Sequence, residues 1–158
     1  MKKINNPWIN LTDIGYNCFG CAPSNPGGLK LEVYEDGDDV VSFWNPHPNF
    51  QGWLNTLHGG IQATLIDEVA GWLIFRKLQT AGQTVRLNMK YRKAIPTGTD
   101  VQLTIRARLK EVKRNLAIIE SEIIHCGEIC SQADITYFCF SKEKSQQEFY
   151  FSTCETED

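Results

Sequence analysis

The sequence predicts an α+β fold in which an antiparallel β-sheet wraps around one long central α-helix. A single helical segment covers about residues 58–78 and is apolar nearly all round, so it should be buried. Two alternating, strand-like segments precede it within residues 29–44, and four more follow between residues 84 and 140. Strands and helices do not alternate as they would in a parallel sheet, and 158 residues suit a single domain.

The chain divides into three parts by composition. Residues 1–28 are rich in Asn, Pro and Gly and lack periodicity, so we expect an irregular N-terminal lead-in that carries a Cys-x-x-Cys pair. Residues 29–141 hold the predicted folded domain, which begins with a hairpin of residues 29–34 and 40–44 around an acidic turn. We expect residues 142–158 to form a charged C-terminal tail.

The helical segment has two unlike faces. Small residues line one face, and Asp67 projects from the middle of it. The other face carries the large residues Ile61, Leu65, Val69 and Trp72. Glu68 lies on this second face, about 100° around the helix from Asp67. We therefore expect the two acids to occupy different pockets, with Glu68 in a structural or partner-facing position.

Period-two alternation follows the helix. In residues 85–92 apolar side chains alternate with Arg, Asn and Lys, which predicts a strand with one dry and one wet face. The pattern returns in residues 101–109, 116–124 and 129–140, with turn signals between the segments. We expect these segments to form consecutive antiparallel strands.

Composition and charge exclude several classes of protein. The formal net charge of −3 argues against a protein that coats DNA or binds a membrane surface through net positive charge. The most apolar window, residues 61–75, is too short for a membrane span and contains two acids. The N-terminus lacks the apolar run of a signal peptide. Six cysteines are too few for a disulfide scaffold, so we predict a cytoplasmic location with reduced thiols.

The start of the predicted helix has the properties of an anion site. Backbone N–H groups in a first helical turn have no intrahelical acceptor, and Gly59 and Gly60 would let a ligand oxygen approach them. Asp67 lies two turns further on in an apolar segment, where a carboxylate is costly unless it is paired or faces a wet cleft. This pattern indicates a reaction centre. The alternative is that the glycines only permit tight packing and the acid binds a loop or a partner subunit.

The segment from His58 to Glu68 closely resembles the signature of hotdog-fold acyl-CoA thioesterases of the PaaI type, which is His-Gly-Gly, four residues, Leu, any residue and an acid. Four further blocks resemble those that accompany this signature in one subgroup of the superfamily. They are Cys18–Cys21, Asn25–Leu29, Phe50–Trp53 and Val85–Arg92, in this order. The resemblance covers about residues 18–110.

This resemblance implies a hotdog fold whose subunits pair edge to edge, as a homodimer or a dimer of dimers, with active sites at the interface. It gives Asp67 the role of general base or nucleophile. It also places His58 and the N–H of Gly59 or Gly60 where the substrate carbonyl is polarised. The implied reaction is hydrolysis of an acyl-CoA thioester to a free acid and coenzyme A. The substrate itself carries the coenzyme A, so we expect no separate cofactor.

Two other functions remain open at this stage. A hotdog domain can act as a non-catalytic module that binds acyl-CoA or a metabolite, although such a module has little need for an acid at position 67. A dehydratase or hydratase would need an acid and a histidine in an arrangement that the sequence does not show. We assign Trp53 and Asn55 to substrate binding. Asn55-Thr56 replaces the Pro-Gly of many relatives, and Ala94 replaces a Pro, so the resemblance implies the chemistry but does not extend to the acyl-chain specificity.

Nine basic residues and only two acidic ones are concentrated between Arg86 and Arg114. A positive sheet face near the helix start would suit the phosphates of coenzyme A, and the alternative is a solvated outer face without a ligand. Our phosphate candidates are Lys90, Arg92, Lys113 and Arg114. Nucleic acid is a poor candidate because the aromatic interleaving of an RNA platform is missing.

The cysteines suggest a metal only weakly. Cys18 and Cys21 have the spacing of one half of a zinc site. Cys126 and Cys130, with His125, could supply the other half, but nothing in the sequence brings the two groups together. We therefore expect no metal site, and interpret these thiols as buried or loop residues.

Overall fold

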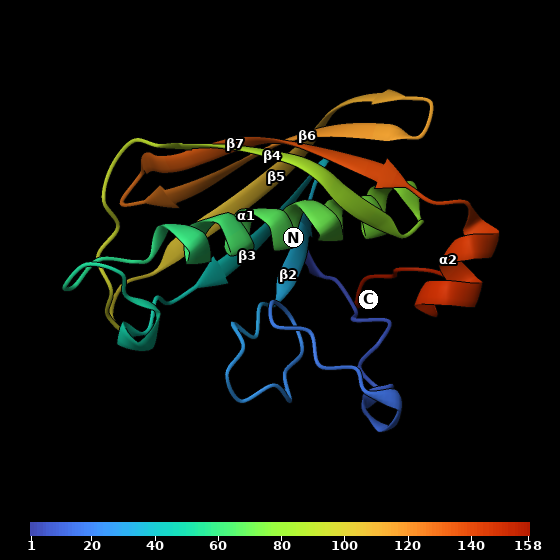
Figure 1. Cartoon of the computed structure of the whole chain (residues 1–158), viewed down its shortest axis with the longest axis horizontal. Coiled ribbons are helices and arrows are strands. Elements are labelled where there is room, and N and C mark those ends of the chain that lie inside the picture. The colour runs from blue at the N-terminus through green and yellow to red at the C-terminus, as the bar shows by residue number, and fades with distance from the viewer.

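The computed structural model describes all 158 residues and contains a seven-stranded sheet packed over one long helix (Figure 1). The helix α1 continues through one π-helical turn, η3, as far as Leu78, which confirms its expected extent. The elements in chain order are β1 Lys2–Lys3, η1 Thr12–Ile14, β2 Val33–Asp36, β3 Asp39–Trp44, η2 Pro48–Phe50, α1 Gly59–Leu73, η3 Ile74–Leu78, β4 Gly82–Tyr91, β5 Leu103–Lys113, β6 Leu116–His125, β7 Glu128–Cys139 and α2 Lys142–Phe149.

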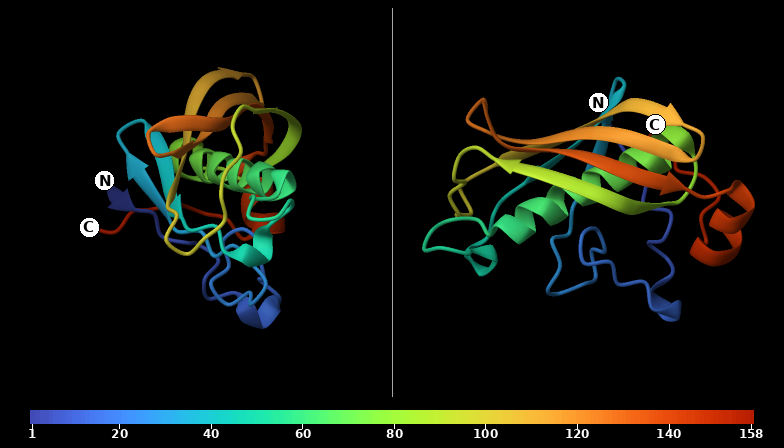
Figure 2. Two further views of the ribbon diagram at one scale, coloured as in Figure 1. Left: turned by 90° about the vertical axis from the view of Figure 1, so that its left-hand side faces the viewer. Right: turned by 45° about the horizontal axis from the view of Figure 1, so that its top comes forward.

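The sheet is entirely antiparallel, with the strand order β1-β2-β3-β5-β6-β7-β4. This order corrects one expectation, because β4 pairs with β7 and not with β5, the next strand along the chain. The loop of residues 92–102 runs from the β4 edge of the sheet to β5 in its middle. β4 therefore forms an edge of the sheet, and the two views of Figure 2 show the sheet curling over α1.

The core lies between α1 and the concave face of the sheet. The helix contributes several fully buried side chains, each worth about 1.5–3 kcal/mol when removed from water. These are Leu65, Ile66, Val69 and Leu73. The facing strands contribute Leu103, Ile105, Ala107, Ile119 and Ile123, which are also fully buried. The predicted alternation of β5 and β6 therefore places their apolar residues on the helix side.

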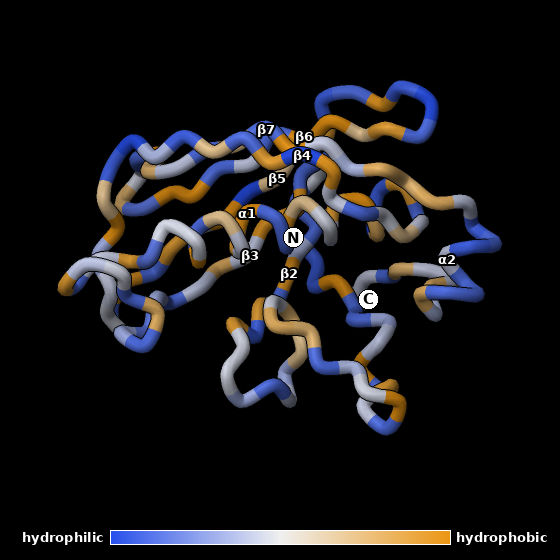
Figure 3. The backbone as a smooth tube through the Cα atoms, in the orientation of Figure 1, coloured by the Kyte–Doolittle hydropathy of each residue, from blue (hydrophilic) through white to orange (hydrophobic).

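The lead-in and the C-terminal segment cover the face of α1 that the sheet leaves open. Trp8 packs edge-on against Trp72 and Phe75, with ring centroids 6.1 and 5.0 Å apart. The expectation of a charged C-terminal tail is wrong, because residues 142–149 form the predominantly hydrophilic α2 (Figure 3) and Phe151 then turns inward, where it is 1% exposed. Its ring contacts Trp8, at a centroid distance of 5.8 Å. The segment is rich in charged residues, yet it also contributes the ring of Phe151 to the core.

A half-buried ion-pair cluster joins the end of the helix to the β2–β3 hairpin. The Glu35 carboxylate accepts from Arg76 Nε at 2.9 Å and from Lys77 Nζ at 2.7 Å. Burial alone would raise the pKa of Glu35, but the hydrogen bonds from Lys77 and Arg76 outweigh it and hold this pKa below its ordinary value. Arg76 also donates to the main-chain oxygen of Cys154, so the cluster fixes the C-terminal segment as well.

Neither helix of the protein combines the length and the apolar character that crossing a lipid bilayer requires.

Candidate active site

The N-terminus of α1 carries a defined hydrogen-bonding arrangement. His58 caps the helix, and its Nδ1 accepts the backbone N–H of Gly60 at 2.8 Å. A neutral imidazole that accepts at Nδ1 carries its proton on Nε2, so His58 presents an N–H donor beyond the helix end. Gly60 therefore has no free donor, in contrast to the expectation that either glycine could serve. The Gly59 N–H has no acceptor in the protein and remains available to a ligand oxygen.

Two cavities flank His58. One, of about 350 Å³, lies against the first turns of α1 and is lined by Asn49, Phe50, Gln51, His58, Gly60, Ile61 and Thr64. The other, of about 530 Å³, lies against the preceding loop and is lined by Gln51, Gly52, Trp53, Thr56, Leu57, His58 and Gly59. Space for a ligand therefore exists on both sides of the imidazole.

The loop before the helix presents Trp53 to solvent, with 86% of its surface exposed. Trp53 lines the larger cavity, which is consistent with the predicted contact to substrate. Asn55 lies at the turn of this loop in the left-handed region, with a φ of 57°, and its N–H donates to Gln51 Oε1 at 3.2 Å. Asn55 does not line either cavity, so the structure gives it a role in shaping the loop.

Asp67 lies in the middle of α1 and has two carboxylate oxygens in different surroundings. Oδ1 accepts from Thr84 Oγ1 at 2.7 Å and lies 2.9 Å from the hydroxyl of Tyr137. Oδ2 accepts no hydrogen bond from the protein, and it is not fully buried, because no fully buried polar side-chain atom of the protein lacks a partner. One oxygen is thus held in place, and the other is free to bind a proton or attack an electrophile.

Thr84 and Tyr137 lie on the paired strands β4 and β7 and were not among the predicted site residues. A β-bulge between Thr84 and Arg86 makes Val85 the extra residue, which leaves Val85 57% exposed and aims Thr84 at the helix. The strand therefore departs from the strict alternation expected there. The Tyr137 hydroxyl also lies 2.7 Å from the main-chain oxygen of Asp67. Burial, with the nearby charge of Asp67, raises the pKa of Tyr137, so this hydroxyl keeps its proton and donates.

Asp67 and the helix start of the same chain are too far apart to act on one carbonyl group. Eight residues separate Gly59 from Asp67, and at 1.5 Å per residue this distance along the helix is about 12 Å. For hydrolysis, the acid must lie within about 3 Å of the attacking water, and that water must lie about 3 Å from the thioester carbonyl carbon. The oxyanion donor must also lie within about 3 Å of the carbonyl oxygen. Within one chain, therefore, the structure does not bring the predicted catalytic residues together.

The four basic candidates form two groups and not one. Lys90 and Arg92 lie at the end of β4 near the helix start, where Tyr91 donates from its hydroxyl to the main-chain oxygen of Gly59 at 2.8 Å. Lys113 and Arg114 lie at the β5–β6 turn, which the strand registers align with Gln83 at the other end of β4. Seven residues along that strand separate the two groups by about 23 Å.

The second group has its own cavity. Lys113 and Arg114 line a space of about 560 Å³ at the β5–β6 turn, together with Asn115, Leu116 and Phe138. Glu111 partly compensates Lys113, at 3.3 Å. On one subunit, the phosphates of a single ligand could bind to Lys90 and Arg92 or to Lys113 and Arg114, but not to both pairs.

Glu68 lies on a different face of the helix from Asp67, as expected, and contacts Cys18 of the lead-in. Burial raises the pKa of Glu68 to about 7, and its carboxylate accepts from Trp72 Nε1 at 3.2 Å. The cysteine groups do not meet: Cys126 lies beside His125 at the β6–β7 hairpin, whereas Cys18 and Cys21 lie beside Glu68.

An antiparallel sheet wrapped over one long helix, with an acid in the middle of that helix, defines a hotdog fold. The sequence model of the thioesterase superfamily matches residues 54–127 of the chain. This segment contains the helix, Asp67 and Thr84. No curated protein sequence matches the chain.

Solved structures support the same fold. A thioesterase superfamily protein superposes with a TM-score of 0.70 at 22% identity, covering 77% of this chain and 62% of its own. The chain thus spans less than two thirds of that relative. A hypothetical thioesterase with coenzyme A from Streptococcus pneumoniae gives 0.63 at 23% identity, covering 70% and 89%. A Streptococcus mutans protein bound to acetyl CoA gives 0.63 at 18% identity, also covering 70% and 89%.

Proposed function

We propose that the protein hydrolyses an acyl-CoA thioester to a free acid and coenzyme A, as a PaaI-like thioesterase. The observation that carries this proposal is the asymmetric environment of the Asp67 carboxylate. Thr84 and Tyr137 hold Oδ1, and Oδ2 has no protein donor and is not fully buried. A carboxylate needed only for packing would have both oxygens bonded, whereas a general base or nucleophile needs one oxygen free.

The reaction follows from these groups. As a general base, Asp67 takes a proton from water through Oδ2 while the water oxygen attacks the thioester carbonyl. The resulting oxyanion accepts from the Gly59 N–H and from His58 Nε2–H, and one such donor typically contributes about 10²–10³ in rate. Collapse breaks the C–S bond, and the leaving thiolate receives the proton. In the alternative route, Oδ2 attacks the carbonyl directly and water hydrolyses the resulting anhydride.

The site requires a second copy of the chain. Because Asp67 lies about 12 Å from Gly59 of its own helix, the oxyanion donors that serve it come from the helix start of the partner subunit. A homodimer with a two-fold axis would contain two such sites, and a dimer of dimers would contain four. The exposed aromatic side chain of Trp53, beside the helix start, suits either an acyl chain or the partner surface.

Coenzyme A is the substrate carrier that best fits the surface charges. Lys90 and Arg92 lie at the helix-start end of β4, which suits them to its phosphates. Two structural neighbours contain coenzyme A or acetyl CoA, which supports the same ligand here. The reaction needs no cofactor apart from the coenzyme A of the substrate. The cytoplasmic location stays a prediction from cysteine usage.

The test is thiol release from a panel of short-chain, long-chain and aryl-acyl-CoA substrates. We expect wild type to hydrolyse at least one of them and Asp67→Asn to lose turnover while remaining folded and dimeric. Asp134→Asn is the matched control, since Asp134 is an exposed acid on β7 with 60% of its side chain accessible. Equal turnover in Asp67→Asn and wild type would remove Asp67 from the mechanism. Binding of acyl-CoA without thiol release would identify a binding module instead.

A further inference from the structure

A second cluster of reactive side chains lies on the face of α1 that looks away from the sheet. The thiols of Cys18 and Cys21 and the carboxylate of Glu68 offer ligand atoms that all lie within 4.8 Å of one another. Cys18 Sγ lies 3.7 and 3.9 Å from the two carboxylate oxygens. Cys21 is buried, at 7% exposure. The thioesterase mechanism uses none of these groups.

The backbone around the two cysteines is held in a fixed turn. The N–H of Ala22 donates to the oxygen of Cys18 at 3.1 Å, which closes the turn between the two thiols. On the flanks, the N–H groups of Leu29 and Leu31 donate to the oxygens of Phe19 and Gly20, at 2.7 and 2.9 Å. Both cysteines therefore reach the carboxylate from a framework that is already ordered.

The turn is pressed closely against the helix at Gly20. A Cβ atom at this position would lie 2.3 Å from Glu68 Oε2, so only glycine allows the turn to approach so near. Such proximity brings both sulfur atoms to a carboxylate that no lysine or arginine pairs with. The hydrogen bond from Trp72 Nε1, at 3.2 Å, is its only nitrogen donor. A half-buried carboxylate beside two thiols is a cluster of electron-rich atoms with no cationic side chain paired to it.

We propose that Cys18, Cys21 and Glu68 bind one zinc ion that fastens the N-terminal lead-in to the central helix. Two thiolates and one carboxylate suit zinc, because soft sulfur ligands select it over magnesium or calcium. With bonds of about 2.0–2.3 Å, ligand atoms around a tetrahedral zinc ion lie about 3.3–3.8 Å apart. The Cys18–Glu68 distance of 3.7 Å already matches this separation, and the longest distance needs a side-chain movement of about 1 Å.

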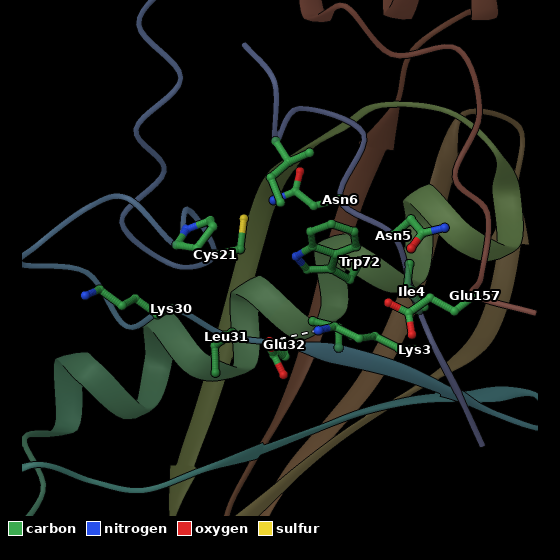
Figure 4. A pocket seen from close by; sticks show the side chains of 13 residues that line it. Lys3, Ile4, Asn5, Asn6, Cys21, Lys30, Leu31, Glu32, Trp72 and Glu157 are labelled. Atoms are coloured by element: carbon green, nitrogen blue, oxygen red, sulfur yellow. Dashed lines mark hydrogen bonds and ion pairs between the residues drawn. The ribbon is translucent and has the colours of Figure 1, made fainter. Parts of the chain in front are cut away.

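The remaining coordination position and the access route are also present. Water or the second carboxylate oxygen of Glu68 can occupy the fourth position, and the hydroxyl of Tyr16, 3.3 Å from Cys21 Sγ, can donate to the thiolate from outside. A cavity of about 290 Å³ between the lead-in and the helix is lined by both Cys21 and Trp72 (Figure 4). An ion can therefore reach the cluster from solvent.

This inference revises the expectation that the chain has no metal site. The sequence suggested Cys126, Cys130 and His125 as the missing ligands, whereas the third ligand comes from the helix, 50 residues away from Cys18. Glu68 directly follows Asp67, so the ion would also fix the rotation of the helix at the proposed catalytic position. The zinc site does not depend on the proposed hydrolysis.

The test is metal content and cobalt spectroscopy of the reduced, full-length protein. We expect about one zinc per chain in wild type after reconstitution, and Co²⁺ in its place should give near-ultraviolet sulfur-to-cobalt charge-transfer bands for two thiolates. Cys18→Ser and Cys21→Ser should lose the zinc, and Glu68→Gln should bind it more weakly. Cys126→Ser, which changes an exposed thiol at the β6–β7 hairpin, is the matched control and should keep the zinc.

Three outcomes would overturn the proposal. They are a reduced wild-type protein that retains no zinc or cobalt, cobalt spectra without thiolate bands, and full zinc retention in both serine variants. Circular dichroism of each variant reports whether it folds. If a serine variant does not fold, the cobalt spectrum of wild type decides alone, because it counts the thiolate ligands directly.

Discussion

Thr84→Val tests how the carboxylate of Asp67 is held. The substitution keeps the shape and the strand preference of the side chain but removes the hydroxyl that donates to Oδ1 at 2.7 Å. A hydrogen bond to a charged group contributes about 1.5–3 kcal/mol, which corresponds to roughly 10- to 100-fold in rate if the whole contribution serves the transition state. Tyr137 still bonds the same oxygen at 2.9 Å, so we expect the lower end of this range.

The assay is steady-state thiol release from the best acyl-CoA substrate. Thr84 touches Asp67 and not the substrate, so kcat should fall about 10-fold with little change in KM. Thr84→Ser restores the hydroxyl and should recover most of the activity. Thr104→Val, on the β5 strand, is the matched control, because the Thr104 side chain makes no hydrogen bond. Unchanged kcat in Thr84→Val, or an equal loss in Thr104→Val, would refute a positioning role for Thr84.

Three further predictions concern assembly and stability. When the Asp67→Asn and His58→Ala variants are unfolded together and refolded, about a quarter of wild-type activity should return. Half of the dimers then contain one chain of each variant, and each of these dimers has one intact site out of two. No recovery of activity would show that one chain supplies both residues. Glu35→Gln should lower the free energy of unfolding by about 1–2 kcal/mol near pH 7, measured by urea unfolding. The pKa of Glu35 is lowered in the folded state, so the stability difference between wild type and Glu35→Gln is complete above the unfolded-state pKa of Glu35. It vanishes as the pH falls through the folded-state pKa. A stability difference that persists in acid would contradict the ion-pair cluster. Phe151→Ala should cost about 3–5 kcal/mol, because the ring is 1% exposed, and a loss below 1 kcal/mol would return the C-terminal segment to the status of a loose tail.

The central helix and its acid could be predicted from the sequence because their signals are local. An apolar run of about 20 residues with a single acid on its small-residue face stands out without any knowledge of the fold. The sequence signal for the helix start is equally local, since Gly59 and Gly60 directly follow the capping residue His58. The structure adds only that the N–H of Gly60 is bonded to His58, which leaves the N–H of Gly59 free.

The groups that hold Asp67 could not be predicted in this way. Thr84 and Tyr137 are ordinary strand residues, and their meeting depends on two features of long range. The edge strand β4 must pair with β7, and a bulge must turn Thr84 toward the helix. The separation of Lys90 from Lys113 has the same origin, because strand register and not sequence distance decides where each charge lies. The C-terminal segment was misjudged because its many charged residues mask Phe151, the buried aromatic residue that anchors it.

The two ends of the chain close upon each other, and this has a kinetic consequence. The N–H of Glu157 donates to the oxygen of Lys3, and the N–H of Asn5 donates to the oxygen of Glu155, both at 2.8 Å. These contacts join residues about 150 positions apart, so they form only after nearly the whole chain is ordered. They should be among the last contacts made in folding and the first opened by thermal fluctuation. Amide hydrogens at this seam will therefore exchange faster than those of α1, although both are hydrogen-bonded.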